Sequence, residues 1–176
     1  TTSAALTTFH TGLTPQEHGL PEWNVYFEEF DSIIQTLPFK TWAMTETDGL
    51  LKEGGNASML YQGPTAYSEL AEHDIASYVF IKQDYVDTVY SQSTHRGSTI
   101  VPFSDGTDML HKLVETLKVA PEQAYFMVYW ADIDSTAHKY GPDTPEHEGA
   151  IARFDRLMRE EFFSKLTPEL RRDTAL

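Results

Sequence analysis

The 176-residue sequence contains no cysteine. Disulfide bonds and thiolate metal sites are therefore excluded, and any metal must be held by carboxylate, imidazole or hydroxyl groups. Basic residues are also scarce, since 13 Lys and Arg stand against 27 Asp and Glu for a formal net charge of -14. Such a surface repels nucleic-acid backbones, which disfavours a role in coating DNA or RNA. A small phosphorylated substrate is still compatible with this negative charge, because bound divalent cations can make the electrostatic potential of one site positive.

Long hydrophobic runs are missing as well. No stretch approaches the roughly 18 apolar residues that a membrane span needs, and no secretory signal opens the sequence. A cytoplasmic location is therefore slightly favoured, while the oligomeric state is left open. With 40% hydrophobic residues, the chain is long enough to bury one sizeable core, and its length favours one domain over residues 1–176.

Strands and helices are expected to alternate along the chain. The hydrophobic pattern of residues 25–37 fits either a helix or a strand, and residues 21–62 are rich in turn signals that permit a cap or flap. Residues 123–134 are continuous and aromatic-rich, which is typical of a central strand covered on both faces. A short apolar run predicts a further strand at 75–81. Apolar stripes at helical spacing predict four helices, at 2–11, 65–73, 107–120 and 144–166. The sequence therefore predicts an α/β fold with a largely parallel sheet flanked by helices.

Asp134 and His138 follow the strongest predicted strand with the spacing D-x-x-x-H. One helical turn would bring this carboxylate and imidazole onto one face, close enough to share a divalent cation. The carboxyl ends of the strands are also where chemistry gathers in such sheets. The alternative is a solvated surface pair, which is the default interpretation for this spacing alone.

Thr2 begins the first predicted helix. A hydroxyl at a helix N-terminus lies beside free N–H groups and the positive end of the helix dipole, which favours a developing alkoxide and an incoming phosphate. The alternative is an ordinary N-cap.

Two strings of the sequence together resemble a known family. Residues 2–19 fit a pattern of nucleophile threonine, short helix, Thr-Gly, two residues, Pro, two residues and His-Gly. Residues 129–142 fit a second pattern, in which an Asp, three residues and a His precede an aromatic-Gly-Pro turn. In this order and about 120 residues apart, they resemble the type I phosphodiesterases and nucleotide pyrophosphatases of the alkaline phosphatase superfamily.

The resemblance implies an alkaline-phosphatase-like core and a site for two divalent metal ions, with zinc as the expected metal. Thr2 would be the nucleophile, adjoining the metals and forming a phosphothreonine. Asp134 and His138 would be metal ligands. Asn24 lies one residue from the position at which some members carry a phosphate-binding asparagine, so it is the candidate substrate-binding residue, with a turn residue as the alternative. The substrate would be a small phosphodiester or a nucleotide.

Further metal ligands of the family have no counterpart here, since no Asp-His dipeptide occurs in the sequence. Residues 1–176 are therefore expected to be a fragment of one phosphodiesterase domain that binds at most partial metal and is inactive alone. The alternative functions are a phosphomonoesterase, phosphonate hydrolase or sulfatase of the same superfamily. A non-catalytic binding or scaffold domain with this fold is the alternative from another class.

Overall fold

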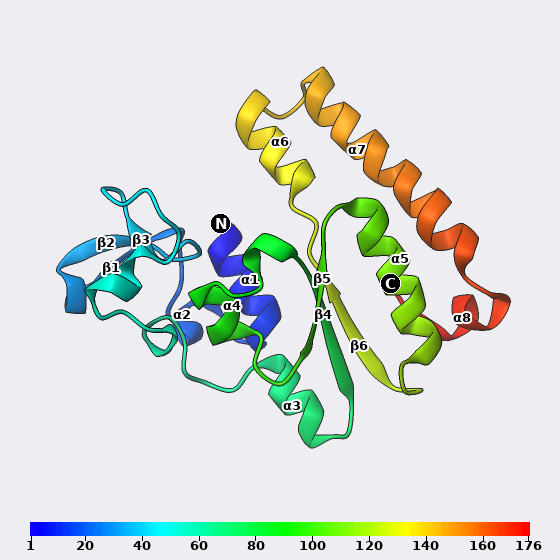
Figure 1. Ribbon diagram of the computed structural model, residues 1–176, viewed down its shortest axis with the longest axis horizontal. Helices are drawn as coiled ribbons and strands as arrows, with labels where there is room; N and C mark the ends of the chain where they lie inside the picture. The colour runs from blue at the N-terminus through cyan, green and yellow to red at the C-terminus, as the bar shows by residue number, and fades with distance from the viewer. The chain divides into compact units, whose positions relative to one another are not determined.

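The protein is described by a computed structural model of residues 1–176, which form two compact units. The first unit comprises Thr1–Ser77 and Asp84–Thr99, and the second comprises Tyr78–Gln83 and Ile100–Leu176. Figure 1 labels their helices and strands. None of the helices combines the length and the apolar character that crossing a membrane requires.

Four short helices build much of the first unit. Helix α1 spans Thr2–Thr11, as the sequence predicts, and Gly12 ends it in the left-handed conformation with φ of 73°. Glycine takes this conformation without the steric cost of a Cβ. Helix α1 contacts all three of the other helices of this unit, α2 (Pro15–His18), α3 (Ala66–Glu72) and α4 (Val89–Thr94). The helix that begins with Thr2 is therefore a central element of this unit.

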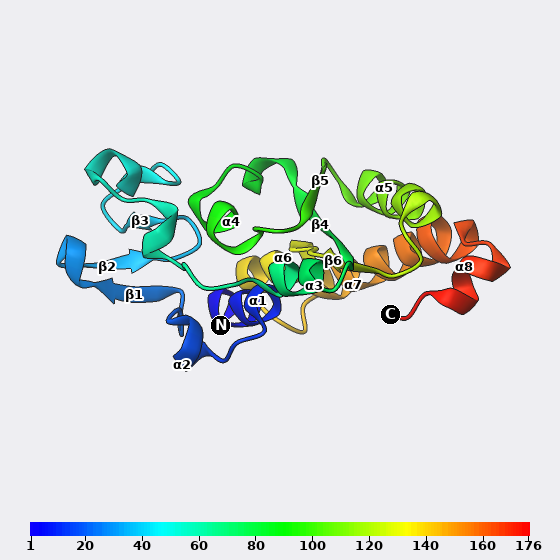
Figure 2. The ribbon, with the colours of Figure 1, turned by 90° about the horizontal axis from the view of Figure 1, so that it is seen from below.

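An antiparallel sheet of three strands completes the first unit. It has the order β1-β2-β3, with β1 at Asn24–Phe27, β2 at Ser32–Gln35 and β3 at Lys40–Thr41. For residues 25–37, the sequence left a helix and a strand as alternatives. The antiparallel β1–β2 hairpin, which Figure 2 shows from a second side, decides in favour of strands. The turn between them is a 3₁₀ helix (Glu28–Phe30), and two more follow β3 (Gly49–Glu53 and Ala57–Met59).

A parallel sheet of three strands, flanked by helices, confirms the predicted α/β class. Strands β4 (Ala76–Lys82), β5 (Thr99–Phe103) and β6 (Ala124–Val128) are arranged in the order β5-β4-β6. Helix α5 (Gly106–Val119) follows β5, and α6 (Asp132–Tyr140) follows β6. The sequence patterns predicted β4, β6 and α5, but they did not single out β5.

Strand β6 is an edge strand of this sheet, which corrects the prediction of a central one. In β6, Tyr125 is exposed and the other four residues are half-buried. By contrast, Val79, Phe80 and Ile81 of β4 are buried. An edge strand has one hydrogen-bonded neighbour instead of two. An apolar sequence favours a strand without choosing its place in the sheet, because that place depends on pairing with distant residues.

The single helix expected at 144–166 is divided in the structure. Helix α7 covers Pro145–Leu157, a π-helical turn covers Met158–Phe162 and a 3₁₀ turn covers Phe163–Lys165, before α8 (Pro168–Asp173). Helices α6 and α7 lie side by side as a pair (Figure 1). The π-helical turn carries Phe162, which is fully buried in the core of the second unit among residues of β4, β5 and α5.

Candidate active site

Thr2 is the first residue of α1, at the end where backbone N–H groups lack helical partners. The first backbone hydrogen bond of the helix joins the N–H of Ala5 to the carbonyl of Thr1 at 3.0 Å, so the N–H groups of Thr2, Ser3 and Ala4 precede it. No acidic residue lies in the first turn. Thr2 is half-buried, whereas Ser3 beside it is fully buried. This end of α1 can therefore favour an anion near the Thr2 hydroxyl.

Asn24 is the first residue of β1 and is exposed. It lies opposite Gln35 in the β1–β2 pairing. Next to this pair, the N–H of Thr36 donates to the carbonyl of Trp23 at 2.9 Å. Asn24 therefore belongs to a regular strand, which decides against its alternative interpretation as a turn residue. The first unit contains both Asn24 and Thr2, the candidate nucleophile.

His18 fixes the turn that joins α2 to the chain leading into β1. Its Nε2 lies 3.3 Å from the Thr8 hydroxyl of α1, and its Nδ1 accepts a hydrogen bond from the Leu20 N–H at 3.1 Å. The side chain is buried, and burial lowers the pKa of His18 below its usual value. Gly19 follows in the left-handed conformation with φ of 79°. His18 thus acts as a neutral structural residue between two segments of the first unit.

Asp134 and His138 meet on one face of α6, as their spacing predicts. The carboxylate oxygen Oδ1 of Asp134 lies 3.5 Å from Nε2 of His138, and both side chains are exposed. Carboxylate oxygen and imidazole nitrogen are donors that zinc accepts in proteins. The structure holds no group of three or more His, Asp or Glu side chains that could close a site around one ion. Asp134 and His138 therefore fit two positions of a metal site, and both belong to the second unit.

A buried pair of histidines, His10 and His95, lies in the first unit. Nε2 of His10 lies 3.3 Å from Nε2 of His95, and Nδ1 of His10 lies 2.6 Å from the Tyr67 hydroxyl. Nδ1 of His95 is buried without a hydrogen-bond partner. Burial, with a smaller effect of the nearby His95, lowers the pKa of His10 to about 3, and burial lowers the pKa of His95 to about 4. Both rings are therefore neutral at pH 7.

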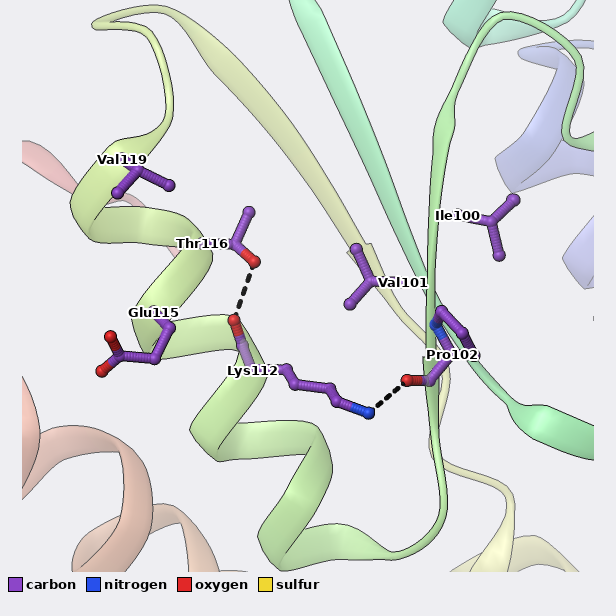
Figure 3. A pocket seen from close by; sticks show the side chains of 7 residues that line it. All are labelled: Ile100, Val101, Pro102, Lys112, Glu115, Thr116 and Val119. Carbon is purple, nitrogen blue, oxygen red and sulfur yellow. Dashed lines mark hydrogen bonds between the residues drawn. The ribbon is translucent and has the colours of Figure 1, made fainter.

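The second unit has an open groove of about 480 Å³ between β5 and α5 (Figure 3). Lys112 reaches from α5 to donate to the carbonyl of Pro102 at 2.8 Å, and it also pairs with Asp108 at 2.9 Å. Glu115, a second charged residue of the groove, pairs with Lys118. None of the candidate site residues lines this groove, whose remaining lining residues are Ile100, Val101, Thr116 and Val119.

The fold and the candidate residues define an α/β protein with a threonine at one helix N-terminus and a carboxylate–imidazole pair that follows a strand. The chain belongs to the type I phosphodiesterase / nucleotide pyrophosphatase family, since the profile of that family matches residues 1–176. Membership implies a hydrolase of the phosphodiesterase or pyrophosphatase type. No match to a curated protein was found.

Sequence patterns did not predict two side-chain hydrogen bonds that connect α1 to distant residues. Ser3 and Thr36 bond to each other beside Thr2, and Tyr67 bonds to His10 near the other end of α1. The two bonds join residues that are 33 and 57 positions apart. Patterns of local spacing carry no signal for contacts between residues so far apart in the sequence. The only local hint is that position 3 is a polar serine, which is compatible with a polar contact.

Proposed function

We propose that this protein is a metal-dependent phosphodiesterase or nucleotide pyrophosphatase that uses Thr2 as its nucleophile. The observation that carries the proposal is the family match over residues 1–176. The place of Thr2 at the start of α1 and the pairing of Asp134 with His138 support it. The substrate would be a small phosphodiester or the phosphoanhydride of a nucleotide.

In this proposal the Thr2 oxygen attacks phosphorus, and the bond from phosphorus to the leaving oxygen breaks. The product is a phosphothreonine, which water then cleaves to regenerate the hydroxyl. The free N–H groups at the start of α1 stabilise the negative charge on the phosphoryl oxygens, and the Asn24 amide donates to one of them. Asn24 in this role is supported by its exposed place on β1, in the same unit as Thr2.

Asp134 and His138 would hold a divalent cation, with zinc as the expected metal and two ions as the expected number. When bound, such ions lower the pKa of a coordinated hydroxyl or water and neutralise phosphoryl charge.

The first experiment compares Thr2→Ala with Thr2→Ser in the zinc-loaded full-length protein, using bis-p-nitrophenyl phosphate. We expect Thr2→Ala to lower kcat by more than about 10³-fold, as loss of a nucleophile does in other hydrolases, and Thr2→Ser to keep part of the activity. Full activity of Thr2→Ala would remove Thr2 as the nucleophile.

The same assay separates the proposed activity from its relatives. The unsubstituted protein should hydrolyse the diester faster than p-nitrophenyl phosphate or p-nitrophenyl sulfate. A preference for the monoester or the sulfate would favour a phosphatase or a sulfatase instead. Absence of all turnover in the zinc-loaded full-length protein would favour the non-catalytic binding domain.

A further inference from the structure

Two buried hydroxyls connect the start of α1 with the segment that leads into β1. Oγ of Ser3, the residue after Thr2, lies 2.7 Å from Oγ1 of Thr36. Both side chains are 0% exposed, so neither hydroxyl can exchange its partner for water. Breaking this bond would leave an unsatisfied polar group inside the protein, which is costly.

Thr36 also holds the backbone next to Asn24. Its N–H donates to the carbonyl of Trp23 at 2.9 Å, and its hydroxyl donates to the same carbonyl at 3.3 Å and to that of Glu22 at 3.4 Å. The single hydroxyl proton of Thr36 serves either one of these carbonyls or Ser3, so either hydroxyl can be the donor in the Ser3–Thr36 bond.

These contacts form one connected set of hydrogen bonds. The Thr7 hydroxyl donates to the Ser3 carbonyl at 2.7 Å, the Ser3 and Thr36 hydroxyls bond to each other at 2.7 Å, and the Thr36 hydroxyl lies 3.3 Å from the carbonyl of Trp23. Within this set, Ser3 directly follows Thr2 in the sequence and Trp23 directly precedes Asn24. All of these residues belong to the first unit. The helix and the strand segment are therefore connected through one bond between two fully buried hydroxyls and through part-buried bonds from Thr36 to backbone carbonyls.

We propose that Ser3 and Thr36 are positioning residues that set the Asn24 amide relative to the Thr2 hydroxyl. This inference rests on the proposed function, in which Thr2 attacks phosphorus and Asn24 contacts a phosphoryl oxygen. Neither Ser3 nor Thr36 touches substrate, since both are fully buried. Their effect on rate comes from geometry, because a small displacement of one reacting group relative to another costs a large part of the rate.

The test measures kcat and KM for bis-p-nitrophenyl phosphate in the zinc-loaded protein carrying Thr36→Val or Ser3→Ala. We expect each substitution to lower kcat by about 10- to 100-fold, with a smaller change in KM. Thr36→Ser keeps the hydroxyl and should restore most of kcat. The double variant should be no slower than the slower single variant, because both substitutions remove the same bond.

Thr94→Val is the matched control. Thr94 is a threonine with 0% exposure in the same unit, and its hydroxyl donates to the Tyr90 carbonyl within α4 at 2.8 Å. The Thr94→Val variant should lose stability as the Thr36→Val variant does, but it should keep the kcat of the unsubstituted protein. Equal losses of kcat in Thr94→Val and Thr36→Val would overturn the inference, since both would then reflect general loosening. Thermal melting and near-UV circular dichroism identify variants that fail to fold.

The Asn24→Ala background gives the decisive comparison. If Thr36 acts through Asn24, then Thr36→Val should have little further effect on kcat once the Asn24 amide is absent. An undiminished effect in that background would overturn the inference. Failure of the proposed function looks different, because it appears either as an active Thr2→Ala variant or as an unsubstituted protein without any turnover of the diester. An inactive Thr2→Ala together with an unchanged kcat in Thr36→Val contradicts the positioning role alone.

Discussion

Asp134 and His138 owe their proximity to one turn of α6. Residues four apart on a helix share a face whatever the rest of the protein does, so their spacing was sufficient to predict the contact. Asp132 begins the same helix two residues before Asp134, and residues two apart on a helix point to different sides. One short helix therefore carries both the candidate ligand pair and a carboxylate suited to serve as its control.

Removing either candidate ligand should weaken metal binding. We expect Asp134→Asn and His138→Gln each to lower zinc affinity by at least the roughly 10- to 100-fold that follows loss of a supporting residue at such sites. The measurement is zinc per chain by mass spectrometry after dialysis against graded chelator. Asp132→Asn removes the same charge and should retain the affinity of the unsubstituted protein. Equal zinc retention in all four proteins would remove Asp134 and His138 as ligands.

Helix α1 is held in the first unit by side-chain hydrogen bonds along its length. Ser3 bonds to Thr36, the Thr7 hydroxyl lies 3.0 Å from the Tyr90 hydroxyl, and His10 bonds to Tyr67 and His95. The hydroxyl bonds do not titrate in acid, whereas the bonds of the buried His10 and His95 rings depend on these rings staying neutral. The histidine pair is the part of this arrangement that pH can change.

Acid should destabilise the first unit through His10 and His95. Their folded pKa values of about 3 and about 4 lie below the value of 6.5 for an unperturbed histidine. The unfolded chain therefore binds more protons between these values, so stability is present above pH 6.5 and is lost as pH falls below it. The free energy of unfolding should drop by about 1.4 kcal/mol per pH unit for each histidine in that window.

Urea unfolding at pH 7.5 and pH 5.5 measures this effect. His95→Gln should reduce the difference between the two pH values by about 1 kcal/mol, because one titrating group is gone. His73→Gln removes an exposed histidine and should leave the difference unchanged. A pH difference that is the same in all three proteins would contradict the assignment of acid sensitivity to the buried pair.

At the scale of the whole molecule, each unit has its own buried interior. The second unit gathers its core around Phe80, Phe103, Met109, Leu110 and Phe162. Apolar burial of this kind is the main favourable term in folding, and it must compensate for the repulsion within a chain of net charge -14. Phe162 is supplied by the π-helical turn after α7, where the sequence predicted one continuous helix over 144–166.

Truncating Phe162 should therefore lower the free energy of unfolding as much as truncating a central core residue does. We expect Phe162→Ala to lower the free energy of unfolding by about 3–5 kcal/mol, as measured by urea denaturation. Phe163→Ala is the matched control, since the adjacent Phe163 is 39% exposed and should cost less. Equal losses in the two variants would contradict the central place of Phe162.

The sequence by itself determined what depends on nearby residues. It predicted helix α1 with its end at Gly12, the shared face of Asp134 and His138, the α/β class and the family, because helical spacing and motif order are written along a short stretch of chain. Tertiary structure decided the edge position of β6, the Ser3–Thr36 bond and the His10–His95 pair. The two side-chain contacts join residues 33 and 85 positions apart, and the strand order likewise depends on pairing between distant segments. Such contacts form only when the chain folds, since local spacing does not specify which distant buried groups become partners.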